Sequence, residues 1–254
     1  MKQLVAGLLA GVLIAAPAPA AAAPSDPVSA LKSRIGAGKG VSFTDVTSFI
    51  ELSGQTKIMT RTGTLQYGRR GFAASDVSVK MAKQDNLSTL FEHDERFVTI
   101  GKATYRKGAI LGEKLPKGKS WVRTRATLPV GISGMFSQPV NAAEPETLKA
   151  LITASEPKGR TYSGTITFRQ LAKASPWTRL TQFGKPDDTV IRFTLTLGSG
   201  NLPVRLETVH MAEGHWLGRQ QEGDEVRHRT VYKGWGARTT ITAPPAKQVY
   251  TGKK

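Results

Sequence analysis

The most constraining feature of this sequence is a pair of short runs in which apolar and polar side chains alternate on either side of a turn. The runs are 191–197 and 202–207, and the residues between them are Gly-Ser-Gly-Asn. Alternation with a period of two is typical of a half-buried strand, and glycine and asparagine favour tight turns. The sequence therefore predicts an antiparallel hairpin. One register satisfies both faces and pairs Phe193 with Leu206, Leu195 with Val204 and Arg192 with Glu207.

Two more short strands are predicted downstream of this hairpin. The first covers 231–236 and bends at Trp235, which lies between two glycines. The second covers 239–243 and stops at Pro244 and Pro245, because proline cannot donate a hydrogen bond to a neighbouring strand. The C-terminal part of the chain is thus expected to be almost entirely strand and turn.

Four segments resemble a known family. They are 200–206 (GNLPVRL), 232–236 (YKGWG), 240–249 (TITAPPAKQV) and, upstream, Tyr105 followed by 115–122 (LPKGKSWV). Together they resemble the LolA-like lipid-carrier proteins, specifically the LppX/LprG type of bacterial lipoprotein. The resemblance covers mainly the second half of the chain. It implies an α+β, mainly β fold, in which a curved antiparallel half-barrel sheet has helices covering its concave side and a cavity that holds acyl chains.

The remaining sequence fits a fold rich in strands. Strands are predicted over 42–53, 56–67, 71–81, 97–100, 103–107, 121–124 and 162–168. One helix is predicted to begin with Asp26 as N-cap and Pro27 in its first turn. A second begins at Pro145, where Glu144 and Glu146 complement the helix dipole, and ends before Pro157. Many strands with few helices predict an antiparallel sheet with helices on one face.

The N-terminus has the pattern of an export signal. Lys2 is followed by an uncharged apolar run over 4–16, which is too short to span a bilayer, and then by small residues over 18–23. We expect a signal peptide over 1–22, cleaved after Ala22, and one LolA-like domain over 23–254; the alternative is a buried N-terminal helix. The resembling lipoproteins carry a lipidated cysteine, but this chain has no cysteine. The expected product is therefore secreted or extracytoplasmic in the cell envelope, without a lipid anchor.

The 254 residues are 39% hydrophobic, which fits a single domain with a substantial core. None of the four histidines has the spacing of a metal-binding motif, and His93 beside Asp94 is better explained as a solvated turn. The sequence lacks nucleophile-elbow, phosphate-loop and dinucleotide-binding motifs, and Asp187 with Asp188 falls in a predicted loop. We therefore expect no enzyme activity, cofactor or metal.

The net charge of +17 is large for a chain of this length and favours an anionic partner. Aromatic residues are sparse near the basic ones, so base stacking on a nucleic acid is not expected. The predicted partner is an anionic membrane surface or cell-wall polymer, and the alternative is a basic surface that only keeps the protein soluble. The residues expected to contact the anionic surface are Lys102, Arg106, Lys107, Lys114, Lys117, Lys119, Arg123 and Arg125.

Two functions remain open from the sequence. In the first, which the resemblance implies, a monomeric exported protein carries a lipid or another long apolar ligand in an internal hydrophobic cavity. In the second, a basic extracytoplasmic module docks on an anionic surface and its half-barrel is filled by side chains, without a ligand cavity. In the first case the cavity would be lined by Leu65, Val77, Val79, Phe97, Leu148, Leu151 and Ile152, with Met135 and Phe136 at its mouth in the glycine- and proline-rich segment 128–140.

Overall fold

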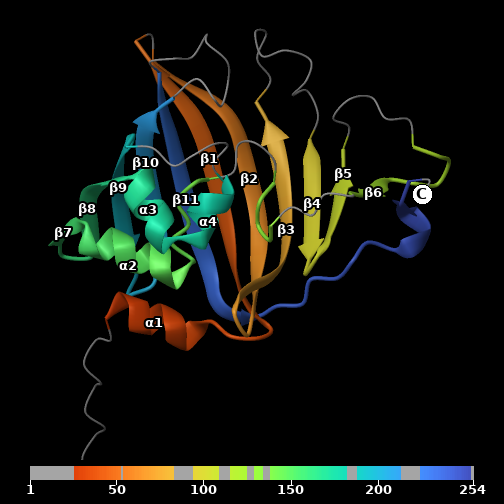
Figure 1. Cartoon of the computed structure of the whole chain (residues 1–254), viewed down its shortest axis with the longest axis horizontal. Coiled ribbons are helices and arrows are strands. Elements are labelled where there is room, and N and C mark those ends of the chain that lie inside the picture. Colours follow the sequence, from red (N-terminus) through yellow and green to blue (C-terminus); the bar gives the residue numbers. More distant parts are fainter. Residues whose placement is uncertain are drawn as a thin grey trace, which may run out of the picture.

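One large sheet with helices against one of its faces organises this protein (Figure 1). The computed structural model describes residues 26–52, 54–82, 94–108, 115–124, 129–133, 138–181, 188–212 and 224–252. The fold is mainly β, as the sequence predicts: the sheet is open and curved, has twelve strands within the described ranges and is consistent with a half-barrel. Within the described ranges, none of the helices has the length and apolar character needed to cross a membrane.

The described chain begins with α1, continues through one meander of strands, β1 to β6, and then through a second, β7 to β11, which α2 precedes and which α3 and α4 interrupt between β8 and β9. The strands are β1 (Lys39–Glu51), β2 (Gly54–Gly68), β3 (Gly71–Met81), β4 (Glu95–Ile100), β5 (Ala103–Lys107), β6 (Trp121–Arg123), β7 (Ser155–Lys158), β8 (Thr161–Thr167), β9 (Val190–Leu197), β10 (Pro203–Met211), β11 (Glu225–Arg238) and β12 (Val249–Tyr250). The helices are α1 (Pro27–Arg34), α2 (Pro145–Thr153), α3 (Phe168–Ala174), α4 (Pro176–Thr181) and the short 3-10 helix η3 (Ala246–Gln248).

The order of strands across the sheet is β12-β6-β5-β4-β3-β2-β1-β11-β10-β9-β8-β7. Each meander keeps its own sequence order, and the two are joined where β1 pairs antiparallel with β11. The two-residue strand β12 runs parallel to β6 and extends the sheet at that edge. A strand from the start of the chain and one from near its end therefore lie side by side in the middle of the sheet.

The hairpin of β9 and β10 forms, but the predicted register is wrong by two residues. Leu206 lies opposite Leu195 instead of Phe193, and a β-bulge between Pro203 and Arg205 separates this pairing from the turn. A shift of two residues keeps every side chain on its predicted face, so Phe193, Leu195 and Leu206 are all buried. The predicted match of Arg192 with Glu207 is replaced by ion pairs between Arg192 and Glu225 and between Arg229 and Glu207.

Several other elements agree with the sequence. The predicted bounds of β3 and β5 are confirmed. The side chain of Asp26 caps α1 by accepting a hydrogen bond from the backbone N–H of Val28 at 2.9 Å. The helix predicted at Pro145 is α2, but it ends at Thr153, and Pro157 lies inside the edge strand β7.

Two predictions of strands fail. Residues 239–243 form no strand; β11 instead continues to Arg238, and its glycines 234 and 236 adopt left-handed backbone angles. Phe168 does not end β8 but begins α3, because Thr167 forms a capping box. The hydroxyl of Thr167 accepts from the N–H of Gln170 at 3.1 Å, and the side chain of Gln170 accepts from the N–H of Thr167 at 2.9 Å.

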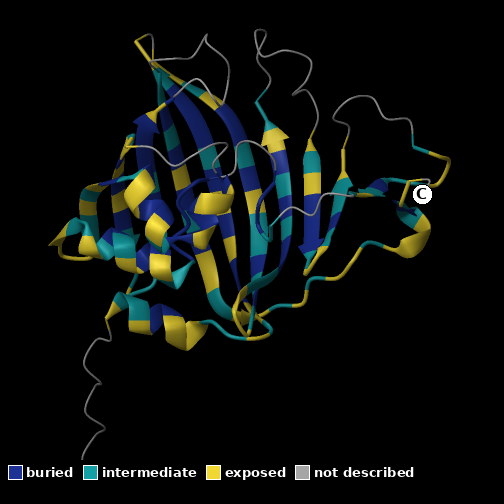
Figure 2. Cartoon of the chain, viewed as in Figure 1, coloured by how far each residue is buried: buried dark blue, intermediate teal, exposed yellow. Residues whose placement is uncertain are grey.

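The face of the sheet that carries the helices is here called the inner face. In Figure 1, α2, α3 and α4 lie in front of the left half of the sheet, whereas β4, β5 and β6 extend beyond them. Leu148 and Leu151 of α2 pack with Leu171 of α3 into one large apolar cluster that includes side chains from most strands. Figure 2 shows the strands of the central sheet as alternating buried and more exposed positions.

The opposite, outer face has its own small apolar cluster at the β4–β6 end of the sheet. Val98, Trp121 and Val249 are buried there, and Ile241 packs against them. The backbone N–H of Ile241 donates to the side chain of Gln66 at 2.8 Å. The chain after β11 thus covers the outer face near β4–β6 instead of adding the predicted strand.

Gly164 provides a test of how closely α2 and β8 approach each other. A Cβ at this position would collide with the backbone carbonyl oxygen of Ala154, the C-cap of α2. We expect Gly164→Ala to lower the free energy of unfolding by about 1–3 kcal/mol, measured by urea denaturation. Gly200→Ala is the matched control, because its Cβ meets only the side chain of Leu202 at 3.9 Å, and it should stay within about 0.5 kcal/mol of the wild type. Equal effects would contradict the close approach.

Candidate ligand-binding site

Most of the residues predicted to line a cavity come together on the inner face. Leu65 of β2, Val77 and Val79 of β3, Phe97 of β4, and Leu148 and Leu151 of α2 all belong to the large apolar cluster. Ile152 is partly buried and packs against the same cluster. Met135 and Phe136 lie outside the described residues. Six residues from four elements therefore meet in one apolar region, where they pack together as a buried cluster; their role as the lining of a ligand cavity stays a prediction.

The strand register explains why these side chains meet. Val77 lies opposite Gly63 on one side and opposite Phe97 on the other. Gly63 has no side chain, and the ring of Phe43 occupies the space above it, where a Cβ would be 2.9 Å from the ring. The close approach of Phe43 to β2 continues the apolar surface from β1 to β4.

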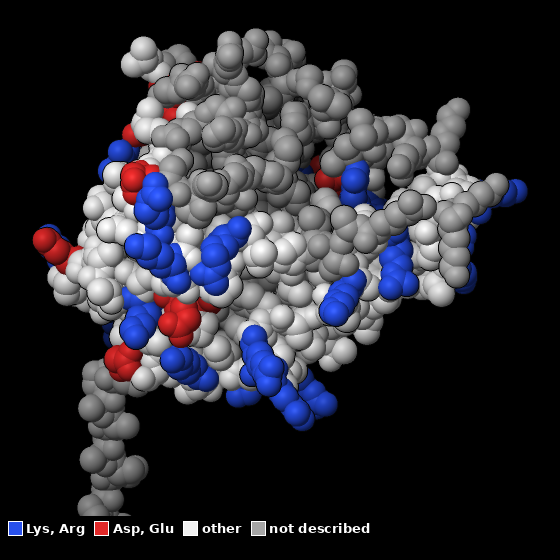
Figure 3. Space-filling view, in the orientation of Figure 1, with Lys and Arg blue, Asp and Glu red and all other residues white. Residues whose placement is uncertain are grey.

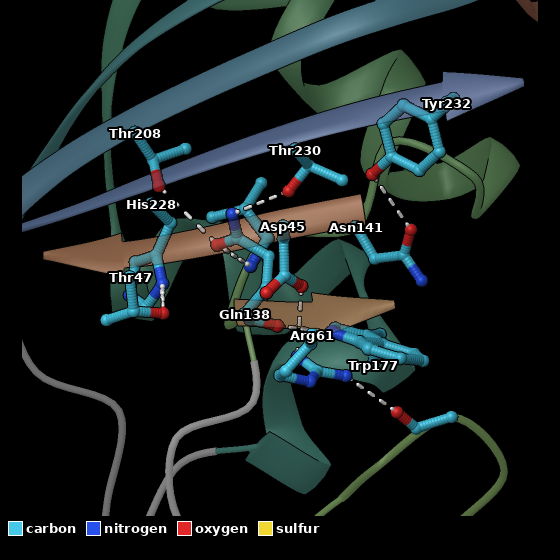
Figure 4. Close-up of polar contacts among 12 residues, drawn as sticks. Asp45, Thr47, Arg61, Gln138, Asn141, Trp177, Thr208, His228, Thr230 and Tyr232 are labelled. Carbon is cyan, nitrogen blue, oxygen red and sulfur yellow. Dashed lines mark hydrogen bonds and ion pairs between the residues drawn. The ribbon is translucent and has the colours of Figure 1, made fainter. Parts of the chain in front are cut away.

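A charged pair interrupts this apolar surface. Asp45 of β1 lies directly opposite Arg61 of β2, and Oδ2 of Asp45 is 3.2 Å from Nη1 of Arg61 (Figure 4). Both side chains are almost completely buried, with 2% and 1% of their surface exposed. Nη2 of Arg61 also donates to the carbonyl oxygen of Gly131 at 3.1 Å, and the guanidinium lies 5.5 Å from the centre of the Phe43 ring.

The charged pair belongs to a band of polar side chains that crosses the middle of the inner face. We call it the polar belt, and it consists of Asp45, Thr47, Arg61, Thr208, His210, His228 and Thr230, all of which are buried. Thr47 and Nδ1 of His228 are hydrogen-bonded at 3.0 Å. The rings of His210 and His228 stack with their centres 5.6 Å apart. A second, smaller apolar cluster of Phe49, Ile58, Ala212 and Val226 lies toward the ends of the same strands.

The segment before α2 covers the polar belt and satisfies much of it. Gln138 donates to the hydroxyl of Thr230 at 3.2 Å and accepts a bond of 3.4 Å from Thr208. The hydroxyl of Tyr232 donates to Oδ1 of Asn141 at 3.1 Å and accepts from the N–H of Ala142 at 3.1 Å. These bonds tie the segment 138–142 to β10 and β11.

Helix α4 is fixed to the same segment through Trp177. Its indole N–H donates to the carbonyl oxygen of Gln138 at 2.7 Å, and its backbone N–H donates to Glu144 at 3.2 Å. The other carboxylate oxygen of Glu144 accepts from the hydroxyls of Thr147 and Ser175. Helices α2, α3 and α4 are therefore held over the inner face by directional bonds as well as by apolar packing.

A small cavity of about 10 Å³ lies beside the charged pair. A cavity of this size holds about one water-sized group. Its lining is polar on one side and apolar on the other: Asp45, Arg61, Gln138, Asn141, Thr230 and Tyr232, with Phe43, Leu65 and Trp177. Oδ1 of Asp45 and Nε of Arg61 are buried and have no hydrogen-bond partner among the described residues.

Burial controls the protonation of this region. It raises the pKa of the Asp45 carboxyl to about 6, because desolvation outweighs the opposite effect of the Arg61 charge. It also raises the pKa of Tyr232. The pKa of His228 is held well below its ordinary value by burial first, and then by His210 and Arg61. At neutral pH the belt therefore contains a neutral His228 and one charged pair, and the neighbouring Tyr232 is also neutral.

The predicted basic surface residues do not share one face of the sheet. Arg106 lies opposite Phe97, faces inward and pairs with Glu95 at 2.9 Å, whereas Arg123 lies opposite Tyr105 on the outer face. Lys102 is in the turn between β4 and β5, Lys107 ends β5, and Lys117 and Lys119 precede β6. Lys114 and Arg125 lie outside the described residues. Figure 3 shows basic side chains at several separate places on one face of the molecule.

The side chains that the sequence analysis considered for chemistry and set aside lie at the margin of the described chain. His93 and Asp187 lie outside it, and Asp188 is in an exposed ion pair with Arg169 at 2.8 Å. In the described ranges, no three histidine or acidic side chains lie close enough together to hold a metal ion.

Comparisons with known proteins identify no family. No family model matches this sequence, and no curated protein matches it. The fold is similar to a crystal structure of a DUF1329 family protein from Desulfovibrio piger, with 11% identity, a TM-score of 0.33 and coverage of 85% of this chain and 96% of that chain. It is also similar to a porin-like protein from Bacteroides uniformis, with 10% identity, a TM-score of 0.25 and coverage of 75% and 95%. Neither similarity identifies the family or the function of this chain.

The buried carboxyl of Asp45 predicts a specific dependence of stability on pH. Its pKa of about 6 in the folded state lies above the value of about 3.9 expected in the unfolded chain. The stabilisation by its proton is therefore complete below about pH 4 and is lost as the pH rises through 6. We expect the ionisation of Asp45 to lower the free energy of unfolding by about 1 kcal/mol between pH 5 and pH 8.

Urea denaturation of the wild type and of Asp45→Asn at pH 5 and pH 8 measures this contribution. The cost of Asp45→Asn should be larger at pH 5, where the wild type still has its stabilising proton. Asp76→Asn is the control, since it removes a carboxylate from the more exposed ion pair with Arg96 and leaves Asp45 in place. An equal cost of Asp45→Asn at both pH values would show that Asp45 does not titrate in this range.

Proposed function

We propose that this protein carries or binds a lipid or another long apolar ligand between the inner face of its sheet and the segments that cross it. The observation that supports this best is the single apolar cluster formed by Leu65, Val77, Val79, Phe97, Leu148 and Leu151. These residues come from β2, β3, β4 and α2. A curved sheet covered by helices on that face is the arrangement expected from the resemblance to LolA-like lipid carriers, and the proposal includes export to the cell envelope and action as a monomer.

Apolar burial alone can supply the binding energy for such a ligand. Each buried methylene contributes about 0.8 kcal/mol, so a long acyl chain gains on the order of 10 kcal/mol before the costs of ordering it. No reaction, cofactor or metal is needed. We place the chain along Val77, Val79 and Phe97, which are the members of the apolar cluster on β3 and β4; these two strands lie beside α2–α4 rather than behind them (Figure 1).

The test is uptake of a fluorescent fatty-acyl probe by the delipidated protein, together with mass spectrometry of lipids that co-purify with it. Val79→Trp places a large ring where the chain is proposed to lie. We expect this variant to lose probe uptake while its free energy of unfolding stays within about 0.5 kcal/mol of the wild type. Val98→Trp is the matched control, because Val98 is also a buried valine but lies on the outer face with Trp121.

Val98→Trp should lose about 1–3 kcal/mol of stability through overpacking and retain uptake in its folded fraction. The carrier proposal is wrong if the delipidated wild type takes up no probe. If Val79→Trp is destabilised as much as Val98→Trp and still takes up the probe, Val79 belongs to the structural core and the ligand lies elsewhere.

One observation favours a second candidate function. The cavity beside the charged pair, at about 10 Å³, is far smaller than the roughly 300–1,000 Å³ of ordinary small-molecule pockets. A protein whose interior is filled by side chains would serve instead as a basic module that docks on an anionic membrane surface or cell-wall polymer. In that case Lys117, Lys119 and Arg123, around β6, are the natural contacts.

Binding to vesicles distinguishes this candidate. If it is correct, binding to anionic vesicles should weaken steeply as salt is added, and the triple reversal Lys117→Glu, Lys119→Glu and Arg123→Glu should weaken it further. The control reverses the exposed Lys32, Lys149 and Lys158, which changes the net charge equally near α1, α2 and β7. Equal binding to neutral and anionic vesicles, or equal effects of the two triple variants, would count against a specific docking surface at β6.

A further inference from the structure

We propose that Arg61 binds the carboxylate of an anionic amphiphile, such as a fatty acid, and that Asp45 takes up a proton when this carboxylate binds. This inference rests on the proposed carrier function and specifies the chemical class of the ligand. It concerns the cavity beside the charged pair, whose lining joins polar and apolar residues.

The first observation is the incomplete pairing of two completely buried groups. Nη2 of Arg61 donates to Gly131, and Nη1 lies 3.2 Å from Oδ2 of Asp45, but neither Nη1 nor Nε has a hydrogen-bond partner among the described residues. Oδ1 of Asp45 is in the same situation. Buried polar groups in proteins nearly always have partners, because an unpaired one costs about 1–3 kcal/mol. Both residues line the cavity, so a polar group placed there would satisfy them.

The second observation is the chemistry of the groups that surround this position. A guanidinium is the side chain best suited to a carboxylate, which it binds through two parallel hydrogen bonds. Tyr232, Asn141 and Gln138 add hydroxyl and amide groups to the wall, whereas Phe43, Leu65 and Trp177 form its apolar side. Phe43 and Leu65 are also members of the large apolar cluster. A ligand with a carboxylate at one end and an apolar chain at the other matches both parts of this lining.

The third step is a balance of charge. Arg61 can neutralise one carboxylate, and two ionised carboxylates beside one buried guanidinium would repel each other in a medium of low dielectric constant. Among the described residues, Tyr232 and His228 from β11 interact electrostatically with the pair, and His210 from β10 stacks on His228; Tyr232 and His228 are neutral at neutral pH. Asp45 is therefore the group that becomes neutral when a second carboxylate arrives, and its burial already favours the protonated form.

The experiment compares three ligands that separate the head group from the chain. Dodecanoate has both, dodecanol has the chain without the charge, and acetate has the carboxylate without the chain. Affinities are measured by calorimetry between pH 6.5 and pH 8.5 in two buffers of different ionisation enthalpy, which counts the protons taken up. For the wild type we expect dodecanoate to bind at least about tenfold more tightly than dodecanol at pH 6.5, since a charge-assisted hydrogen bond is roughly twice as strong as a neutral one. Above pH 6.5 its dissociation constant should rise about tenfold per pH unit, with uptake of about one proton.

The variants identify the residues. Asp45→Asn keeps Arg61 and removes the competing carboxylate, so it should bind dodecanoate more tightly than the wild type at pH 8.5 and without proton uptake. The double variant Asp45→Asn/Arg61→Gln removes both charges of the buried pair and is expected to fold even if the single variant does not, because a neutral replacement of a buried ion pair is often tolerated. It should bind dodecanol as the wild type does and lose its preference for dodecanoate.

The outcomes separate this inference from the function on which it rests. If dodecanol and dodecanoate bind equally and without proton uptake, the carrier function stands and the role of Arg61 is wrong. If neither binds, both proposals fail. If acetate binds as tightly as dodecanoate, the site takes a free carboxylate and the assignment to an amphiphile is overturned. A double variant that still prefers dodecanoate would also overturn it.

Discussion

The pairing of β1 with β11 is the interaction on which the whole sheet depends. It joins a meander formed by the first half of the chain to one formed by the second half, and residues that are almost 200 positions apart, such as Lys39 and Arg238, become neighbours. Closing such a long loop is costly in conformational entropy, although the cost grows slowly with length. Folds dominated by pairings of this kind form slowly. Until β11 is in place, β1 is an exposed edge of the sheet. The pairing therefore covers the free backbone groups of two strands that lie far apart in the sequence.

The sequence predicted the fold where a local pattern was sufficient. Alternation and turn residues gave β3 and β5 with their observed bounds, and Asp26 with Pro27 gave the start of α1. The predictions failed where distant contacts decide the structure. Residues 239–243 alternate like a strand but lie against the outer face, with the N–H of Ile241 bonded to Gln66. The helix α3 could have been found, because Thr167 and Gln170 have the spacing of a capping box, but the apolar alternation before Phe168 suggested a longer strand.

The candidate site was predicted only in its apolar part. Leu65, Val77, Val79 and Phe97 were named from the sequence and do share one face, because hydrophobic residues on alternate positions of a strand point to the same side. Asp45 and Arg61 were missed, although they occupy inward positions in the same patterns, two residues from Phe43 and four from Leu65. A charged residue at an inward position breaks the expected alternation of apolar and polar residues. From the sequence alone, such a break is easily mistaken for the irregular end of a strand. The oppositely charged partner that stabilises such a residue lies on a neighbouring strand. It can be identified only when the register between the two strands is known.

The charged pair also has a consequence for how β1 and β2 find their alignment. A slip of two residues between long antiparallel strands leaves every side chain on its proper face, which is how the register of β9 and β10 was mispredicted. Apolar residues alone distinguish such alternatives poorly. In β1 and β2, a slip of two would move the buried Asp45 away from Arg61 and leave two unpaired charges in the core, at a cost of several kcal/mol. The pair therefore acts as a marker that allows one alignment of the two longest neighbouring strands in the N-terminal half and excludes the others.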